Sequence, residues 1–206
     1  MPTSNAELNK APALRISHIV RGRLNEGNRV KYFVDPEGHK HDRAIPEDVV
    51  LKRWRKRTMA SHSFHGFRLG PNTWKAIAHT FGTFSPKLLD MPVEEIAAKI
   101  SSSQPDRIEK HLWLPEAKSL WLMCQAIGAE RLEQILRRHT ARDRQGRFGT
   151  PDLFLYAIKS GNSKPSFYRM VEVKKPFEEV SADQKEEIEF LRSIGVPARV
   201  LRLIER

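Results

Sequence analysis

The sequence predicts an α/β protein in which a mixed sheet is flanked by helices, and three features of its C-terminal third carry that prediction. Residues 152–158 form a nearly continuous apolar run, which is typical of a buried strand. A polar loop follows, and residues 167–174 form a second strand that should pair with the first as an antiparallel hairpin. A helix and a last strand over residues 198–204 then complete a strand–helix–strand unit. Its right-handed crossover would place the last strand parallel to the second.

The helix of this unit is marked at both ends. Residues 181–184, Ser-Ala-Asp-Gln, form a capping-box pattern that begins a helix. Ile188, Leu191 and Ile194 form its apolar stripe, and Gly195 ends it.

Upstream of residue 150 we expect mainly helices. Pro46 suits a first helical turn, and Glu47 and Asp48 favour the positive end of the helix dipole. The spacing of apolar residues predicts further helices over residues 72–82, 92–100 and 115–128, and another around residues 132–136. Turn signals favour a hairpin over residues 19–34, with a strand from Arg29 to Val34.

Charge indicates the kind of partner. The 206 residues carry a net charge of +11, and a basic surface favours a polyanion because each Lys or Arg on a phosphate releases counterions. A merely basic or ribosome-associated protein fits the charge equally well. The chain divides into a basic N-terminal segment 1–45, a helical region 46–110 expected to grip DNA, and a core 111–206.

Cysteine and apolar content exclude other classes. The only cysteine, Cys124, lies in an apolar run, so neither an internal disulfide nor a cysteine zinc cluster is possible. Histidines 39, 41, 62 and 65 do not have zinc spacing, and we favour surface histidines. We expect a cytoplasmic protein, because the N-terminus lacks a signal-peptide pattern and no run approaches 18 apolar residues.

Three residues of the predicted hairpin suggest chemistry. Side chains two apart on a strand share a face, so Glu172 and Lys174 point the same way. Asp152 begins the neighbouring strand, and the hairpin can bring it beside Glu172. Two adjacent carboxylates repel each other unless a divalent cation neutralises them, and oxygen ligands suit Mg²⁺. The Val173 carbonyl is a further candidate ligand. The alternative is a structural Glu–Lys pair beside a turn-capping aspartate.

At these residues the sequence resembles the PD-(D/E)xK nucleases, and more narrowly the virus-type replication-repair nuclease (VRR-NUC) family. The matching residues are Gly149-Thr150-Pro151-Asp152-Leu153, then Val171-Glu172-Val173-Lys174, then Ser181 with Gln184 and Leu191. The resemblance is tight over residues 115–206. It extends loosely to residue 46, in the manner of the nuclease part of Fanconi-associated nucleases.

The resemblance implies a restriction-endonuclease-like fold and a catalytic group of Asp152, Glu172, Lys174 and Gln184. Asp152 and Glu172 would bind Mg²⁺, with Mn²⁺ as a substitute, and the products would carry 5′-phosphate and 3′-hydroxyl ends. One feature departs from the family, which usually has an upstream helical Glu that completes the metal site. A loose alignment places Phe67 near that position, and Glu116, Glu130 or Glu133 are alternatives.

We therefore expect a magnesium-dependent DNA nuclease that selects flaps, junctions or ends in repair or replication. The backbone contacts would come from Arg53, Arg55, Lys56, Arg57, Arg147 and Lys175, with Arg137, Arg138 and Arg142 as further candidates. Two alternatives stay open: an exported antibacterial DNase toxin, which would imply an immunity protein and action in a target cell, and an inactive DNA-binding module. The sequence leaves the choice between monomer and homodimer open.

Overall fold

The computed structural model describes residues 32–34, 40–42, 45–70, 73–74, 77, 117–143, 149–175 and 178–203. The helices predicted over residues 72–82 and 92–100 lie largely or wholly outside this part of the chain, as do Glu116 and Arg147. No helix within the described part is long and apolar enough to cross a membrane.

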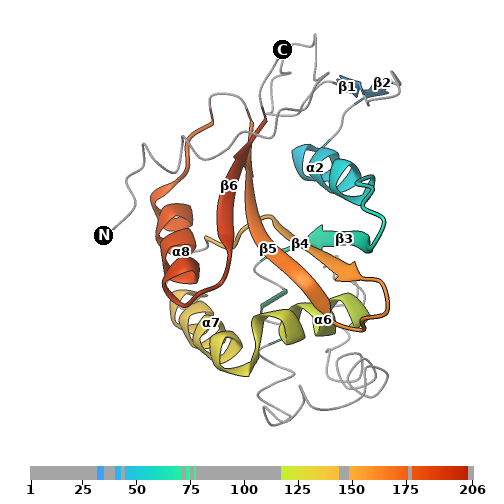
Figure 1. Ribbon diagram of the computed structural model, residues 1–206. Coiled ribbons are helices and arrows are strands. Elements are labelled where there is room, and N and C mark those ends of the chain that lie inside the picture. The colour runs from blue at the N-terminus through green and yellow to red at the C-terminus, as the bar shows by residue number, and fades with distance from the viewer. Residues whose placement is uncertain are drawn as a thin grey trace, which may run out of the picture.

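A four-stranded mixed sheet forms the centre of the molecule (Figure 1). Its order is β3 (His62–Arg68), β4 (Leu153–Lys159), β5 (Pro165–Lys174) and β6 (Ala198–Arg202). The first three strands are antiparallel to their neighbours, and β6 is parallel to β5, as predicted. A separate antiparallel pair joins β1 (Tyr32–Val34) with β2 (Lys40–Asp42). β1 is the end of the strand predicted from Arg29, and the rest of that predicted hairpin lies outside the described residues.

The helices cover both faces of the sheet (Figure 1). Helix α2 (Pro46–Arg55) packs on one face. Helices α6 (Ala117–Ile127), α7 (Ala129–Asp143) and α8 (Ala182–Ser193) pack on the other. Gly128 separates α6 from α7 with a φ of 86°, a conformation that favours glycine. The mixed sheet with flanking helices confirms the predicted fold class.

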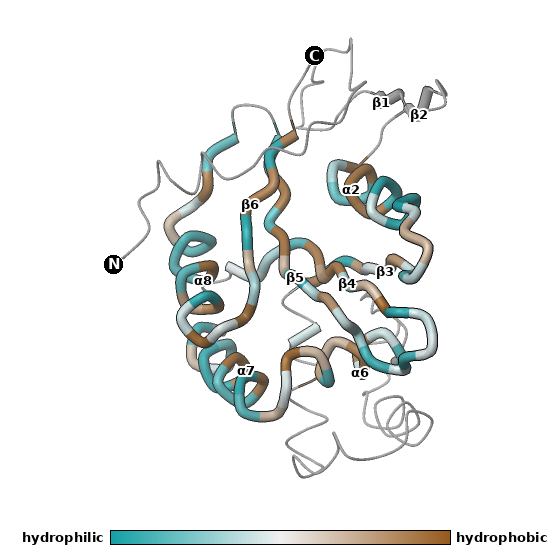
Figure 2. The backbone as a smooth tube through the Cα atoms, in the orientation of Figure 1, coloured by the Kyte–Doolittle hydropathy of each residue, from teal (hydrophilic) through white to brown (hydrophobic). Residues whose placement is uncertain are grey.

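Each face of the sheet has its own apolar core, because side chains alternate along a strand. Figure 2 shows hydrophobic residues, in brown, along the strands of the sheet. On β4, Phe154 and Tyr156 join the larger core under α6–α8, whereas Leu153 and Leu155 join the core under α2. On β5 the same alternation sends Met170 to the first core and Val171 to the second. Glu172 and Lys174 therefore share one face, as the sequence analysis predicted, and that face is the α8 side.

Strand β3 is an element that the sequence analysis did not predict. It lies within residues 46–110, which were expected to be helical, yet it pairs with β4 along its whole length, from His62 opposite Lys159 to Arg68 opposite Leu153. Gly66 permits this packing, because a Cβ there would meet Leu155 and Leu51 at 2.8 and 3.0 Å. Residues 46–70 thus complete the sheet whose other strands lie in the C-terminal core.

Candidate active site

Asp152 is fixed at the open end of the β4–β5 hairpin. The register pairs Leu153 with Val171, so the next position along brings Asp152 opposite Glu172. The Asp152 carbonyl accepts the Leu69 amide at 2.7 Å, and its Oδ2 accepts the Val173 amide at 2.7 Å. The Asp152 carboxylate therefore accepts the Val173 amide hydrogen bond that a backbone carbonyl would accept in a regular antiparallel pair.

Gly149, three residues before Asp152, lets the chain pass close to the first turn of α8. A Cβ at residue 149 would collide with the carbonyl of Asp183, at the first turn of α8. Only glycine permits this passage beneath α8, so Gly149 couples the position of Asp152 to that of α8.

Glu172 and Lys174 form a buried pair beside Asp152. Glu172 is 1% exposed and Lys174 4% exposed. Lys174 Nζ lies 3.0 Å from Glu172 Oε1 and 3.3 Å from Glu178 Oε1. The three predicted residues are thus brought together, and the exposed Glu178 side chain contacts them through Lys174.

Gln184 connects the site to α8. Its Nε2 donates to Glu172 Oε1 at 2.5 Å, and its Oε1 accepts the Ser181 amide at 3.0 Å. Ser181 Oγ in turn accepts the Gln184 amide, which completes the predicted capping box. The sequence analysis expected Gln184 to point inward and need a partner; Glu172 is that partner.

The carboxyl groups of Asp152 and Glu172 both have raised pKa values. Burial raises the pKa of Asp152 to about 6, against the opposing hydrogen bond from Val173, and the charge of Glu47 adds to the rise. Burial, and then the charge of Asp152, raises the pKa of Glu172 to about 8 despite the nearby Lys174. Such shifts mark a site where positive charge is missing.

Lys174 stays an ammonium in this setting. Burial tends to lower its pKa, but the charges and hydrogen bonds of Glu172 and Glu178 together outweigh burial and raise it. At neutral pH the group can hold an anion or orient a water, but it is a poor base.

The free oxygen atoms fit a divalent cation. Glu172 Oε2 is buried and has no hydrogen-bond partner within the described part of the chain. Along β5, the Met170 amide donates to Pro197 and the Lys174 carbonyl accepts from Leu203, so even-numbered backbone groups face β6. Val173 therefore directs its carbonyl to the same edge as its amide, toward Asp152. Two carboxylates and one carbonyl are a set that Mg²⁺, which keeps several waters, accepts.

Glu47 is an acidic residue that the sequence analysis assigned only to the helix dipole. It lies in the first turn of α2, its Oε2 is buried without a hydrogen-bond partner among the described residues, and its charge acts on Asp152. Within the described ranges no group of three Asp, Glu, His or Cys side chains is arranged to hold one ion. Phe67 is buried in β3, and Glu130 and Glu133 are exposed on α7.

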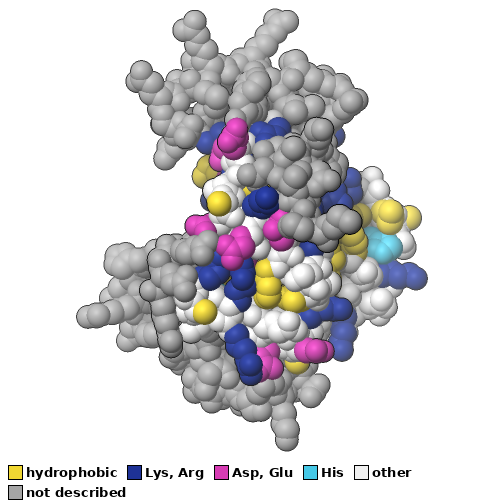
Figure 3. All heavy atoms as spheres, turned by 90° about the vertical axis from the view of Figure 1, so that its left-hand side faces the viewer, with side chains coloured by type: hydrophobic (Ala, Val, Ile, Leu, Met, Phe, Trp, Pro, Cys, Tyr) yellow, Lys and Arg dark blue, Asp and Glu magenta, His cyan; other side chains and the backbone are white. Residues whose placement is uncertain are grey.

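The expected basic contacts divide into two groups. Arg138 pairs with Glu186 and Glu187 at 3.0 and 2.9 Å, and Arg142, which is 7% exposed, pairs with the acidic side chains of α8. Figure 3 shows acidic and basic side chains interspersed on the side of the molecule where α8 lies. The charges of Arg138 and Arg142 thus join α7 to α8 in the structure, and their contact with DNA stays a prediction.

The patch on α2 has a different environment. Arg55 Nη2 donates to the Gly66 carbonyl at 2.6 Å, and the Arg57 guanidinium lies 5.1 Å from the centre of the Trp54 ring. Arg53 is half-buried, and its Nη1 has no hydrogen-bond partner in the part of the chain that the structure describes.

The sheet, with an acidic pair and a lysine at the end of its central hairpin, has the arrangement of a restriction-endonuclease-like nuclease domain. A family model described as the VRR-NUC domain matches residues 89–203, and the chain belongs to the VRR-NUC family. The predicted resemblance is thus confirmed, and the chain is a nuclease domain by family.

Among solved structures, the chain is similar to paFAN1 bound to DNA with a 1-nt 5′ flap and a gap. The two chains are 16% identical, with a TM-score of 0.41, and the match covers 78% of this chain and 35% of the paFAN1 chain. The complex of paFAN1 with a 2-nt 5′ flap and a gap has 16% identity and a TM-score of 0.35, over 94% and 38%. This chain therefore spans little more than a third of those chains. No curated protein matches it.

Proposed function

We propose that this chain is a magnesium-dependent deoxyribonuclease whose active centre is formed by Asp152, Glu172 and Lys174. The observation that carries the proposal is a pair of adjacent carboxylates with raised pKa values, the half-buried Asp152 and the buried Glu172. Glu172 also keeps an unpartnered oxygen beside the buried Lys174 ammonium. A purely structural Glu–Lys pair accounts for neither the second carboxylate nor the free oxygen.

In this proposal Asp152 and Glu172, with the Val173 carbonyl, hold the cation. When bound, Mg²⁺ supplies a Lewis acid for the scissile phosphate and lowers the pKa of water. Lys174 orients the attacking water and stabilises negative charge on the phosphate. Water oxygen bonds to phosphorus as the bond to the 3′ oxygen breaks, and that oxygen leaves with a proton, which gives 5′-phosphate and 3′-hydroxyl ends.

Gln184 and Glu47 act around this centre. Gln184 holds Glu172 Oε1, which leaves Oε2 for the cation. Glu47 adds negative charge beside Asp152, which would strengthen cation binding there.

DNA is the proposed substrate because the chain is strongly basic, with a net charge of +11. Arg53, Arg57 and Lys175 would contact the backbone, and phosphate contacts fix position without reading sequence. We therefore infer selection by DNA structure, such as a flap, junction or end, on DNA in the cytoplasm.

The test is digestion of labelled duplex, single-stranded, flapped and four-way-junction DNA with Mg²⁺ or with EDTA. We expect cleavage with Mg²⁺ only, and none by Asp152→Ala. A wild-type protein that binds all four substrates and cuts none would mean an inactive binding module.

A further inference from the structure

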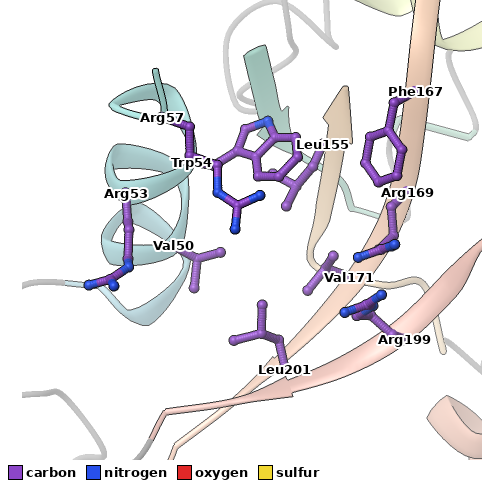
Figure 4. A pocket seen from close by; sticks show the side chains of 10 residues that line it. All are labelled: Val50, Arg53, Trp54, Arg57, Leu155, Phe167, Arg169, Val171, Arg199 and Leu201. Atoms are coloured by element: carbon purple, nitrogen blue, oxygen red, sulfur yellow. The ribbon is translucent and has the colours of Figure 1, made fainter. Parts of the chain in front are cut away.

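A pocket lies on the opposite face of the sheet from the candidate active site. It has a volume of about 100 Å³ and lies between α2, β5 and β6 (Figure 4). Its lining is apolar at the base, with aromatic and basic side chains around it; the ten residues are Val50, Arg53, Trp54, Arg57, Leu155, Phe167, Arg169, Val171, Arg199 and Leu201. None of them is acidic.

The arginines of this pocket concentrate uncompensated positive charge. Figure 4 shows Arg57 directed between α2 and the sheet, and the guanidinium groups of Arg169 and Arg199 close together. No carboxylate in the described ranges forms an ion pair with any of these three. Burial, followed by the charges of Arg199 and Arg57, lowers the pKa of Arg169 to about 10. An anion placed among these groups would relieve their mutual repulsion.

The aromatic side chains are held in place. Trp54 Nε1 donates to the carbonyls of His65 and Tyr156 at 2.8 and 3.2 Å, so its ring is anchored to β3 and β4. Phe167 lies against it with ring centres 5.9 Å apart, yet Phe167 remains 38% exposed. The Arg169 guanidinium lies 4.9 Å from the Phe167 ring centre. A partly exposed aromatic ring beside a guanidinium is a surface on which a nucleic-acid base stacks.

We propose that this pocket binds one unpaired nucleotide of a single DNA strand, with its phosphate on Arg169 and Arg199 and its base against Phe167 and the apolar base of the pocket. The volume is well below the roughly 300–1,000 Å³ of drug-sized ligand sites, which suits one unit of a longer chain better than a whole small molecule. A paired base is stacked inside the duplex and does not reach an apolar pocket, whereas an unpaired base does.

The inference rests on the proposed function for its biological meaning and adds a substrate feature to it. Arg169 and Glu172 lie three positions apart on β5, which separates them by about 10 Å along the strand. Their side chains point to opposite faces of the sheet. The pocket would hold an unpaired segment near the cleavage site while remaining distinct from it.

The experiment measures binding of a fluorescent 12-nucleotide oligothymidylate in EDTA at several salt concentrations. Phe167→Ala should weaken binding on the order of tenfold, as the loss of one stacked base does, with the salt slope unchanged. Arg199→Ala should weaken binding and also lower the slope by about 0.7, the value for one phosphate contact on a single strand. Phe167→Tyr, which keeps the ring, should bind like wild type.

Lys118→Ala is the control, because it removes one positive charge from an exposed residue of α6, on the other face of the sheet from the pocket. If it changes the slope as Arg199→Ala does, or if Phe167→Ala binds like wild type, the pocket has no such role. Thermal unfolding of each variant verifies folding, and Phe167→Tyr keeps the test valid if the alanine variant unfolds.

Competition with thymidine monophosphate distinguishes a site for a DNA strand from a site for a free nucleotide. Full displacement at equal nucleotide concentration would indicate a free-nucleotide site and overturn the strand proposal. The assay contains no divalent ion, so it does not depend on cleavage. A chain that binds through Phe167 but cuts nothing with Mg²⁺ would refute the proposed function and leave this inference intact.

Discussion

Gln184 donates its Nε2 hydrogen to Glu172 Oε1 over 2.5 Å while its Oε1 accepts the Ser181 amide that begins α8. One carboxamide therefore caps a helix and fixes a carboxylate of the candidate active site. The two roles can be separated by substitution, because a glutamate at the third helical position also completes a capping box.

Gln184→Glu should keep the helix cap but lower cleavage by about 10- to 100-fold, as is usual for groups that orient a metal ligand. The new side chain lacks the amide donor and repels Glu172. Ser181→Ala should do the opposite: it costs about 1 kcal/mol of stability through the lost cap and leaves kcat near wild type. Equal kcat values for the two variants would mean that Gln184 serves α8 alone.

Glu47→Gln should weaken Mg²⁺ binding by about tenfold, because it removes the negative charge that acts on Asp152. Asp48→Asn is the matched control. Asp48 is the next residue on α2, but its carboxylate pairs with Arg68. Calorimetric titration with Mg²⁺ compares the two; indistinguishable affinities would remove Glu47 from the account.

Gly149→Ala should destabilise the fold by about 1–3 kcal/mol, the usual cost of an overpacked position, since a Cβ there collides with the Asp183 carbonyl. Cleavage should fall further than stability predicts, because the same shift displaces Asp152. Gly70→Ala, where a Cβ meets nothing within 4 Å, is the control. Denaturant unfolding and cleavage rates are measured on both variants, and a fully stable Gly149→Ala protein would contradict the geometry.

Thermal unfolding in EDTA should reveal the raised pKa values. An acid whose pKa is raised in the folded state stabilises the fold below its unfolded pKa and loses that contribution as pH rises through the folded value. For Glu172 the window runs from about 4.5 to about 8. Glu172→Gln removes this dependence.

The unfolding temperature of Glu172→Gln should therefore exceed that of wild type at pH 8.5 by more than about 2–4 °C, the shift that 1 kcal/mol causes in a chain of this size. At pH 5 the difference should shrink. The same difference at both values would show that Glu172 titrates normally. With Mg²⁺ present, only wild type should gain stability, and that gain should grow between pH 6 and pH 8 as the carboxylates lose their protons.

The sequence was sufficient to predict the hairpin, the parallel last strand and the face shared by Glu172 and Lys174, because strand alternation and capping patterns are local. Strand β3 was missed because the segment His-Ser-Phe-His-Gly-Phe-Arg shows no apolar alternation; it becomes a strand only beside β4. Tertiary packing therefore decided its structure.

The partners of charged side chains could not be predicted from the sequence either, because tertiary packing also determines them. Glu47 fits a helix start on sequence grounds alone, and only the packing of α2 brings it to Asp152. Arg138 and Arg142 belong to a basic run that suggests phosphate contacts, but the acidic residues that neutralise them lie more than forty positions away on α8. No local pattern contains such pairings.

The most direct test of the central claim is titration of the protein with Mn²⁺, followed by the electron paramagnetic resonance signal of the free ion. Wild type should bind Mn²⁺ at the acidic pair, and Mg²⁺ should displace it. Asp152→Asn with Glu172→Gln, which keeps the size of both side chains, should abolish that binding. Mn²⁺ binding by the double variant equal to that of wild type would contradict a cation site formed by Asp152 and Glu172.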